Sequence, residues 1–210
     1  YYLSILKKAG LSADGRQMDL FLSPADQSHV RQFLGQAGLT EQFPVIGINP
    51  GATGGTAKRW FPQRYARLCR KLSSAFGVRI LIFGGPADAE LGEEIAEAAG
   101  GCCLNIAGKT SLGQAFALIE KCSLFVTNDS GLMHAAAALN IPQVALIGST
   151  DHVATAPSSR AAAMIRVPMH CSPCLKDICP DDHACMDRIS VDMVFEKCRE
   201  ILAENTFLRG

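Results

Sequence analysis

Residues 124–148 read LFVTNDSGLMHAAAALNIPQVALIG, and this stretch decides the fold. Its opening run, Leu124–Thr127, is short, apolar and rich in strand-forming residues, which is typical of a buried parallel strand. Turn and helix-capping residues follow at Asn128–Gly131, and the Ala-rich run behind them ends at the stop signal in residues 140–142. The apolar run Val144–Ile147 then predicts a second strand. Strand, helix and strand in this order are the repeating unit of a parallel sheet.

The polar turn at residues 128–131 is also a candidate binding site. In doubly wound sheets, ligands bind where a polar turn leaves the carboxyl end of a parallel strand and opens a helix. The unpaired N–H groups and the positive dipole end of such a helix suit a phosphate. His134 lies one helical turn after Ser130 and on the same face, within reach of the same ligand. The alternative is a capped core helix with a packed histidine, and this turn alone favours neither interpretation.

Strand and helix patterns alternate through the rest of the chain. We expect strands at residues 45–49, 78–83, 103–106, 124–127, 143–147 and 164–167, and helices at 62–76, 87–99, 112–121, 132–139 and 191–204. Ahead of them lie helical patterns at 1–10 and 24–35, the second capped by Ser23, and a strand-like run at Asp19–Ser23. The alternation predicts an α/β fold, a Rossmann-like doubly wound parallel sheet. In such a sheet the strands at 45–49 and 124–127 are neighbours, at the point where the strand order reverses.

Composition limits the class of protein. The chain has 210 residues, of which 48% are hydrophobic, so it has enough apolar side chains for a sizeable core. Twenty basic and twenty acidic side chains cancel, which argues against nucleic acid as a partner. No apolar run reaches the length of a membrane span, and no signal peptide opens the chain. The chain begins at Tyr1 in the middle of a helical pattern, which indicates a fragment.

A second candidate loop, Asn49–Trp60, follows the first strand of the sheet. Its glycines let a ligand approach the backbone closely, and its threonines and basic residues suit a pyrophosphate. The glycine spacing matches neither the dinucleotide fingerprint nor the Walker A loop. Alone, the loop is more typical of a flexible surface turn. The neighbouring strand order, however, should bring it to the same sheet edge as residues 128–131.

A third loop, Gly84–Glu90, follows the second strand. Asp88 in this loop is placed to bind ribose hydroxyls, as the acidic residue of a nucleotide fold does. The alternative is that its carboxylate only complements the dipole of the following helix.

Four motifs together carry a resemblance to the ADP-heptose:lipopolysaccharide heptosyltransferases, glycosyltransferase family nine. They are PGA at 50–52, AKRW at 57–60, GGPAD at 84–88 and TNDSGLMH at 127–134. Members of this family are B-type glycosyltransferases, with two Rossmann-like domains facing across a cleft. The chain resembles the carboxyl-terminal domain, which binds the ADP-sugar. Residues 1–43 would then be the connector and the end of the amino-terminal acceptor domain, residues 44–190 the donor domain with a Cys-rich loop at 168–190, and residues 191–210 the closing helix.

The resemblance implies roles for individual residues. Lys58 and His134 would be catalytic, stabilising the charge that grows on the leaving diphosphate. Donor binding would fall to Thr53, Thr56, Lys58, Asp88, Thr110, Asp129, Ser130, Gly131 and His134. In the inverting transfer, a base deprotonates the acceptor hydroxyl, which attacks the anomeric carbon as ADP leaves. The family's usual base is an aspartate early in the amino-terminal domain, and no residue of this chain matches it.

The resemblance also implies the partners. ADP-heptose would be the donor and the lipopolysaccharide inner core the acceptor, in the cytoplasm, with peripheral contact with the inner membrane left open. No cofactor is expected for the transfer.

Nine cysteines need two explanations. Five lie in apolar surroundings and are typical of buried thiols in a reducing compartment. The other four are Cys171, Cys174, Cys179 and Cys185. They suit a structural zinc ion, which four thiolates hold tetrahedrally, although the second pair lacks the usual spacing of a zinc knuckle. Reduced thiols and disulfides are the alternatives.

Two other functions compete with transfer. A nucleotide-sugar-binding module without activity of its own would keep the loops at Lys58 and Asp129. A nicotinamide-dependent oxidoreductase would need the glycine fingerprint that the chain lacks.

Overall fold

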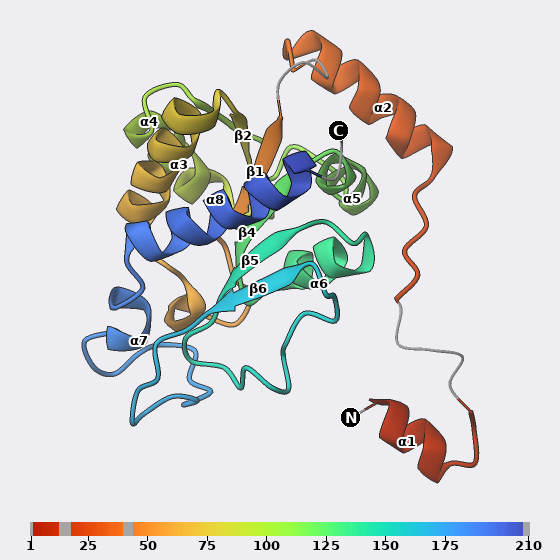
Figure 1. Ribbon diagram of the computed structural model, residues 1–210, viewed down its shortest axis with the longest axis vertical. Helices are drawn as coiled ribbons and strands as arrows, with labels where there is room; N and C mark the ends of the chain where they lie inside the picture. The colour runs from red at the N-terminus through yellow and green to blue at the C-terminus, as the bar shows by residue number, and fades with distance from the viewer. Residues whose placement is uncertain (1, 13–17, 40–43, 208–210) are drawn as a thin grey trace.

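The computed structural model describes residues 2–12, 18–39 and 44–207 (Figure 1). Its centre is a six-stranded sheet in the order β3-β2-β1-β4-β5-β6, in which every neighbouring pair is parallel. The strands are β1 (Val45–Asn49), β2 (Arg79–Ile82), β3 (Cys103–Asn105), β4 (Leu124–Asn128), β5 (Gln143–Leu146) and β6 (Ala162–Ile165). The predicted doubly wound parallel sheet is confirmed. β1 and β4 are neighbours, as predicted, and their register places Asn49 opposite Thr127.

Helices connect the strands and also precede and follow the sheet. They are α1 (Tyr2–Lys8), α2 (Pro24–Gln36), α3 (Pro62–Phe76), α4 (Ala89–Ala98), α5 (Leu112–Glu120), α6 (Gly131–Ala138), α7 (Ala184–Asp187) and α8 (Val191–Phe207). Two 3₁₀ turns, η1 (Thr56–Lys58) and η2 (Pro86–Asp88), lie in the loops after β1 and β2. Local signals explain where α2 begins and where α3 begins and ends. The Ser23 hydroxyl accepts from the Asp26 N–H at 3.0 Å and caps α2. Pro62 opens α3, and Gly77 ends it at φ 64°. No helix in the described part of the chain combines the length and apolarity needed to cross a bilayer.

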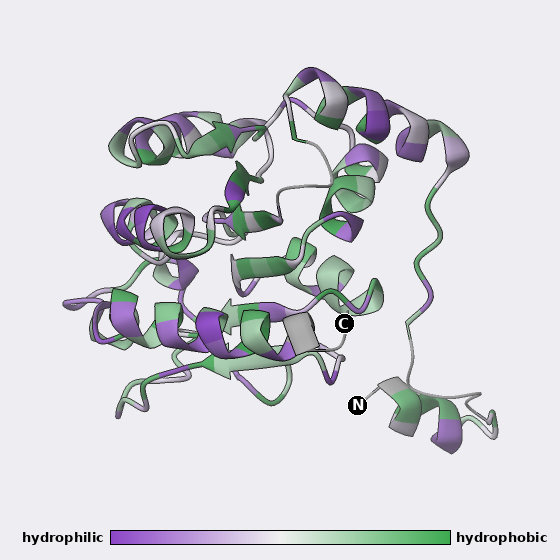
Figure 2. Ribbon diagram, turned by 45° about the horizontal axis from the view of Figure 1, so that its top comes forward, coloured by the Kyte–Doolittle hydropathy of each residue, from purple (hydrophilic) through white to green (hydrophobic). Residues whose placement is uncertain are grey.

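Hydrophobic layers cover both faces of the sheet, because successive side chains of a strand point to opposite faces. Leu124 and Val126 pack in the cluster formed with α3, α4 and α8, whereas Phe125 packs in the cluster formed with α2, α5 and α6. The strands are mostly apolar along their length, whereas hydrophobic and hydrophilic residues alternate along α2 and α8 (Figure 2). This pattern matches a sheet that is buried on both sides.

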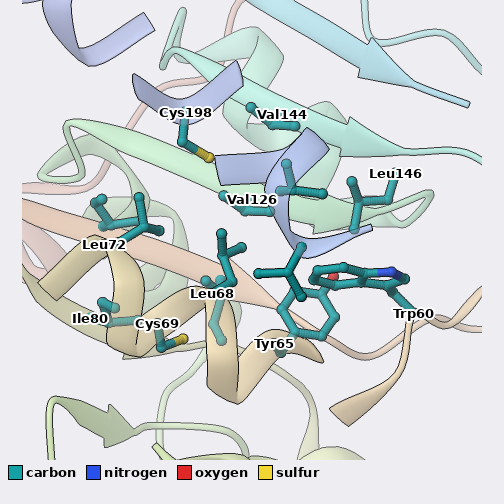
Figure 3. Packing of buried hydrophobic residues seen from close by; sticks show 14 of the residues in the cluster. Trp60, Tyr65, Leu68, Cys69, Leu72, Ile80, Val126, Val144, Leu146 and Cys198 are labelled. Atoms are coloured by element: carbon teal, nitrogen blue, oxygen red, sulfur yellow. The ribbon is translucent and has the colours of Figure 1, made fainter. Parts of the chain in front are cut away.

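Trp60, at the end of the loop after β1, packs into the cluster formed with α3, α4 and α8 (Figure 3). The rings of Trp60 and Tyr65 meet edge to face, with centroids 5.0 Å apart. The Trp60 indole Nε1 donates to the Ile189 carbonyl at 2.9 Å, between α7 and α8. The end of the loop is therefore anchored in the core, while Thr53, Gly54 and Thr56 are exposed.

Three details differ from the expectations. Asp19–Ser23 is not a strand, since it pairs with no strand in the described part of the chain and the Phe21 side chain is 90% exposed. The last strand lies at 162–165 and not at 164–167, because its register is set by pairing with β5. Helix α7 lies inside the Cys-rich loop and was not predicted, since its four residues are too short for a periodic pattern.

Candidate functional site

Polar side chains join the carboxyl ends of β1 and β4. The Asn49 amide donates to the Ser130 hydroxyl at 2.7 Å and to the Thr127 hydroxyl at 3.2 Å. The Asn128 amide donates to the Pro50 carbonyl at 2.7 Å. Asn49, Thr127 and Asn128 are buried, so these bonds form away from water. They hold the loop after β1 against the turn before α6.

Tyr65 and Trp60 attach the core to this network. The Tyr65 hydroxyl and the Trp60 backbone N–H both donate to Asn128 Oδ1, at 3.0 and 3.2 Å. Burial, with a smaller contribution from Cys69, raises the pKa of the Tyr65 phenol well above its ordinary value. The hydroxyl therefore remains a proton donor.

The first turn of α6 carries no side-chain cap. Ser130 occupies the capping position, but its hydroxyl bonds Asn49 and lies 3.2 Å from the Thr127 hydroxyl instead of accepting from the helix. In the described residues the Met133 N–H donates to the Ser130 carbonyl at 3.2 Å, whereas the N–H groups of Gly131 and Leu132 are left for another acceptor. Gly131, the first residue of α6, is exposed, and a Cβ built on it meets no heavy atom within 4 Å. These features favour an anion at the helix start.

A cavity of about 470 Å³ opens beside this turn. It brings together five of the residues predicted to bind the donor: Thr53, Asp88, Thr110, Ser130 and Gly131. Polar groups from the loops after β1 and β4 contribute to its lining. Apolar side chains from the 3₁₀ turn η2, α5 and α6 contribute as well: Pro86, Leu112, Phe116 and Leu132. A ligand that carries both charged and apolar groups fits this mixed lining.

Asp88 is held by protein groups at the edge of the cavity. Its carboxylate lies 3.5 Å from the Arg59 guanidinium and accepts from the Gly85 N–H at 3.1 Å. It also packs against Gly51, where a Cβ would come within 2.5 Å of the carboxylate carbon. Both the predicted ribose role and the alternative helix-dipole role stay open, since Asp88 lines the cavity and also closes the turn before α4.

The other predicted residues do not line this cavity. Thr56 is exposed and Lys58 is half-buried on the 3₁₀ turn η1, and in the described residues no hydrogen bond or ion pair engages the Lys58 ammonium. His134 is exposed on α6, which contradicts the alternative of a packed core histidine. Asp129 is buried with Oδ2 unpaired, so it offers a strong acceptor at the turn. A hydroxyl suits this acceptor better than a phosphate, because like charges repel.

The four clustered cysteines line a second cavity, of about 570 Å³, together with His170, His183 and Ala57. All four are free thiols. Burial, and then the neighbouring Cys171 and Cys179, raise the pKa of the Cys185 thiol. Within the described part of the chain, no three Cys, His, Asp or Glu side chains are grouped closely enough to hold a metal ion. The thiols share a cavity, but their arrangement does not fit the predicted zinc site.

Sequence reasoning did not identify Asn49 and Asn128. Each is the last residue of a buried strand, after Ile48 in β1 and after Thr127 in β4. Polar residues at the carboxyl ends of two adjacent, mostly apolar parallel strands were the available signal.

The chain matches one family model and several named proteins. The model of glycosyltransferase family 9 (heptosyltransferase) matches residues 2–185. Lipooligosaccharide heptosyltransferase 2 of Haemophilus influenzae is 43% identical over 70% of this chain and 44% of its own length. Lipopolysaccharide heptosyltransferase 2 of Escherichia coli K12 is 46% identical over 63% of this chain and 39% of its own. The solved structure of E. coli ADP-heptose lps heptosyltransferase II superposes with a TM-score of 0.74 and 36% identity, covering 90% of this chain and 54% of that one.

The chain therefore spans about half the length of these relatives. Because the matching model covers most of the chain, the protein belongs to glycosyltransferase family 9, the heptosyltransferases.

Proposed function

We propose that this chain binds ADP-heptose and supplies the donor half of an inverting heptosyltransferase that acts on the lipopolysaccharide inner core. The observation that carries the proposal is the uncapped start of α6 beside a cavity lined by both polar and apolar side chains. The helix start suits the diphosphate, and the apolar side chains of the lining suit the adenine. The names of the relatives support the choice of nucleotide and sugar.

The chemistry assigned to this half is stabilisation of the leaving group. As ADP departs from the anomeric carbon, negative charge grows on its diphosphate. Lys58, His134 and the N–H groups of α6 would each bind that charge more strongly in the transition state than in the ground state. Thr53, Thr56 and Ser130 would add hydroxyl donors, and Asp129 would accept from a sugar hydroxyl.

The division of the chain into parts belongs to the same proposal. Residues 44–190 would form the donor domain, residues 191–210 its closing helix, and residues 1–43 the connector to an acceptor domain. In the structure, α8 contributes Val194 and Cys198 to the hydrophobic cluster on one face of the sheet, and α2 contributes Val30 to the cluster on the other face. The transfer would take place in the cytoplasm without a cofactor, and contact with the inner membrane is a further proposal.

Calorimetric titration with ADP-heptose, ADP, GDP and UDP tests the proposal. We expect ADP and ADP-heptose to bind, and GDP and UDP to bind at least roughly tenfold more weakly, since the apolar side chains that line the cavity must match the base. Equal affinity for all the nucleotides would leave the base pocket unsupported. The alternative function is a nucleotide-sugar-binding module without activity of its own. In a protein that carries both halves of a family member, such a module would bind the donor but transfer no heptose.

His134→Ala is expected to slow transfer without unfolding the protein. In a protein that carries both halves of a family member, loss of an imidazole that donates to the leaving diphosphate should lower kcat by roughly tenfold to a hundredfold and change donor affinity little. The side chain is exposed, so the melting temperature should stay close to that of the unaltered protein. His29→Ala, which removes an exposed histidine from α2, is the matched control. Transfer at the normal rate would remove His134 from the active site.

Zinc at Cys171, Cys174, Cys179 and Cys185 stays a separate prediction. Their thiols would have to move together to form a tetrahedral site. Elemental analysis of protein purified without added metal should give about one equivalent if they do. Metal-free protein would leave the reduced thiols or disulfides.

A further inference from the structure

We propose that His183 is a positioning residue for Lys58, acting through the backbone of Ala57. The inference rests on the proposed role of Lys58 in binding the donor diphosphate. It assigns to the Cys-rich loop a part in the donor site, which the cavity beside α6 does not reveal.

Lys58 lies on a turn that holds itself weakly. The 3₁₀ turn η1 has three residues and is closed by one hydrogen bond, from the Arg59 N–H to the Thr56 carbonyl at 2.9 Å. Gly55 before it has φ 101° and offers no side-chain cap. A turn this short has poor internal geometry, so bonds to other segments decide where it sits.

The Cys-rich loop supplies these bonds on one side of Lys58. The Ala57 N–H donates to the Asp177 carbonyl at 2.9 Å, and His183 Nε2 lies 2.9 Å from the Ala57 carbonyl. A carbonyl only accepts, so Nε2 carries the proton and donates. Both polar backbone groups of Ala57, a buried residue, are therefore bound by residues more than 100 positions away.

Trp60 completes the fastening on the other side. Its N–H donates to Asn128 Oδ1 at 3.2 Å, and its indole is buried in the core. Lys58 thus stands between two fixed residues, Ala57 and Trp60. Loss of the Ala57 bond would free the backbone on one side of the lysine and raise the entropy cost of placing its ammonium on a phosphate.

His183 is itself held firmly. Its ring packs against Phe61, with centroids 5.6 Å apart, and its carbonyl accepts from the Met186 and Asp187 N–H groups at 3.0 Å. Arg64 of α3 binds the far end of α7, through the Ile189 carbonyl at 2.9 Å and the Asp187 carboxylate at 2.5 Å. The imidazole is therefore a fixed donor and not a loose surface group.

Gly55 marks how closely the two segments approach. A Cβ on this residue would lie 2.1 Å from the Asp177 carbonyl oxygen. Gly55→Ala should therefore push the loop after β1 away from the Cys-rich loop. Lys58 would then shift because the contact between the two loops is disturbed at Gly55 and not at His183.

Two substitutions separate the hydrogen bond from packing. His183→Gln keeps an N–H donor, whereas His183→Phe keeps a ring against Phe61 and removes the donor. Both keep a Cβ at the left-handed φ of 57°, so their backbone strain is similar. By calorimetric titration with ADP, we expect His183→Phe to weaken binding about three- to tenfold and His183→Gln to stay near the unaltered protein. His170→Ala, an exposed histidine of the same cavity, should change nothing.

A double-mutant cycle with Lys58→Ala decides the inference. If His183 acts through Lys58, His183→Phe should cause no further loss of ADP affinity once Lys58 is alanine. Equal losses in both backgrounds, or a lower melting temperature with unchanged ADP affinity, would reduce His183 to a structural residue and overturn the inference. Should His183→Phe fail to fold, Gly55→Ala takes its place in the cycle with the same expected outcomes. If the unaltered protein binds no ADP, or Lys58→Ala binds it as well as the unaltered protein does, the proposed function of this site fails first, and the inference fails with it.

Discussion

Replacing Gly131 with valine is expected to abolish ADP binding and to leave the fold intact. Gly131 opens α6, lines the cavity of about 470 Å³ and is exposed. No heavy atom lies within 4 Å of a Cβ built there, so the added side chain meets solvent space and not protein. That space is where a phosphate must come to reach the N–H groups of the helix.

The expected loss is large because several charge-assisted bonds disappear together. Each contributes on the order of 1.5–3 kcal/mol, so losing two weakens binding by more than roughly a hundredfold. Calorimetric titration with ADP measures the loss, and thermal unfolding checks the fold. Gly35→Val is the matched control, since Gly35 is also an exposed helix glycine with open space around it, but on α2. Normal ADP affinity in Gly131→Val would mean that the diphosphate does not approach the start of α6.

Lys58→Ala has the second largest expected effect. Lys58 lies in the loop after β1 and is half-buried. Its ammonium has no ion-pair partner in the described residues, so its charge is available to a ligand. One charge-assisted contact to a diphosphate contributes on the order of 1.5–3 kcal/mol, or roughly tenfold to over a hundredfold in affinity. We expect ADP affinity to fall by that factor, and the loss to shrink as salt is raised.

A remote lysine shows whether general charge explains the effect. Lys121 lies at the end of α5, exposed and beside Glu120, before the amino end of β4. Lys121→Ala removes the same charge from the far edge of the sheet and should leave ADP affinity unchanged. If both variants lose affinity equally, Lys58 contributes only to the overall field and makes no direct contact.

Much of the fold follows from local patterns. Short apolar runs predict β1, β2, β4 and β5, and helical periodicity predicts the bounds of α3 and the start of α8, which ends three residues beyond the predicted 204. Asp19–Ser23 has the composition of a strand but is not one, because a strand also needs a partner. The local pattern of that run contains no information on whether a partner lies beside it.

The candidate site was predicted in part. Thr53, Asp88, Thr110, Ser130 and Gly131 meet at one cavity because parallel strands bring their carboxyl ends to one edge. The four cysteines line one cavity, but in the described residues no three of them are grouped closely enough to hold a metal ion, so zinc stays a prediction. Sequence spacing does not specify the path of an irregular loop.

The sequence by itself determined the alternation of strands and helices, the family motifs and the loops at which a ligand is expected, since all of these depend on neighbouring residues. The tertiary structure decided which partners each side chain has: Asp88 pairs with Arg59, Asn49 binds Ser130, and His183 reaches Ala57 across 126 positions of the chain. The physical reason is the range of the interactions. Backbone propensity and side-chain periodicity act over a few residues, whereas these contacts form only after the sheet has brought distant loops to the same edge.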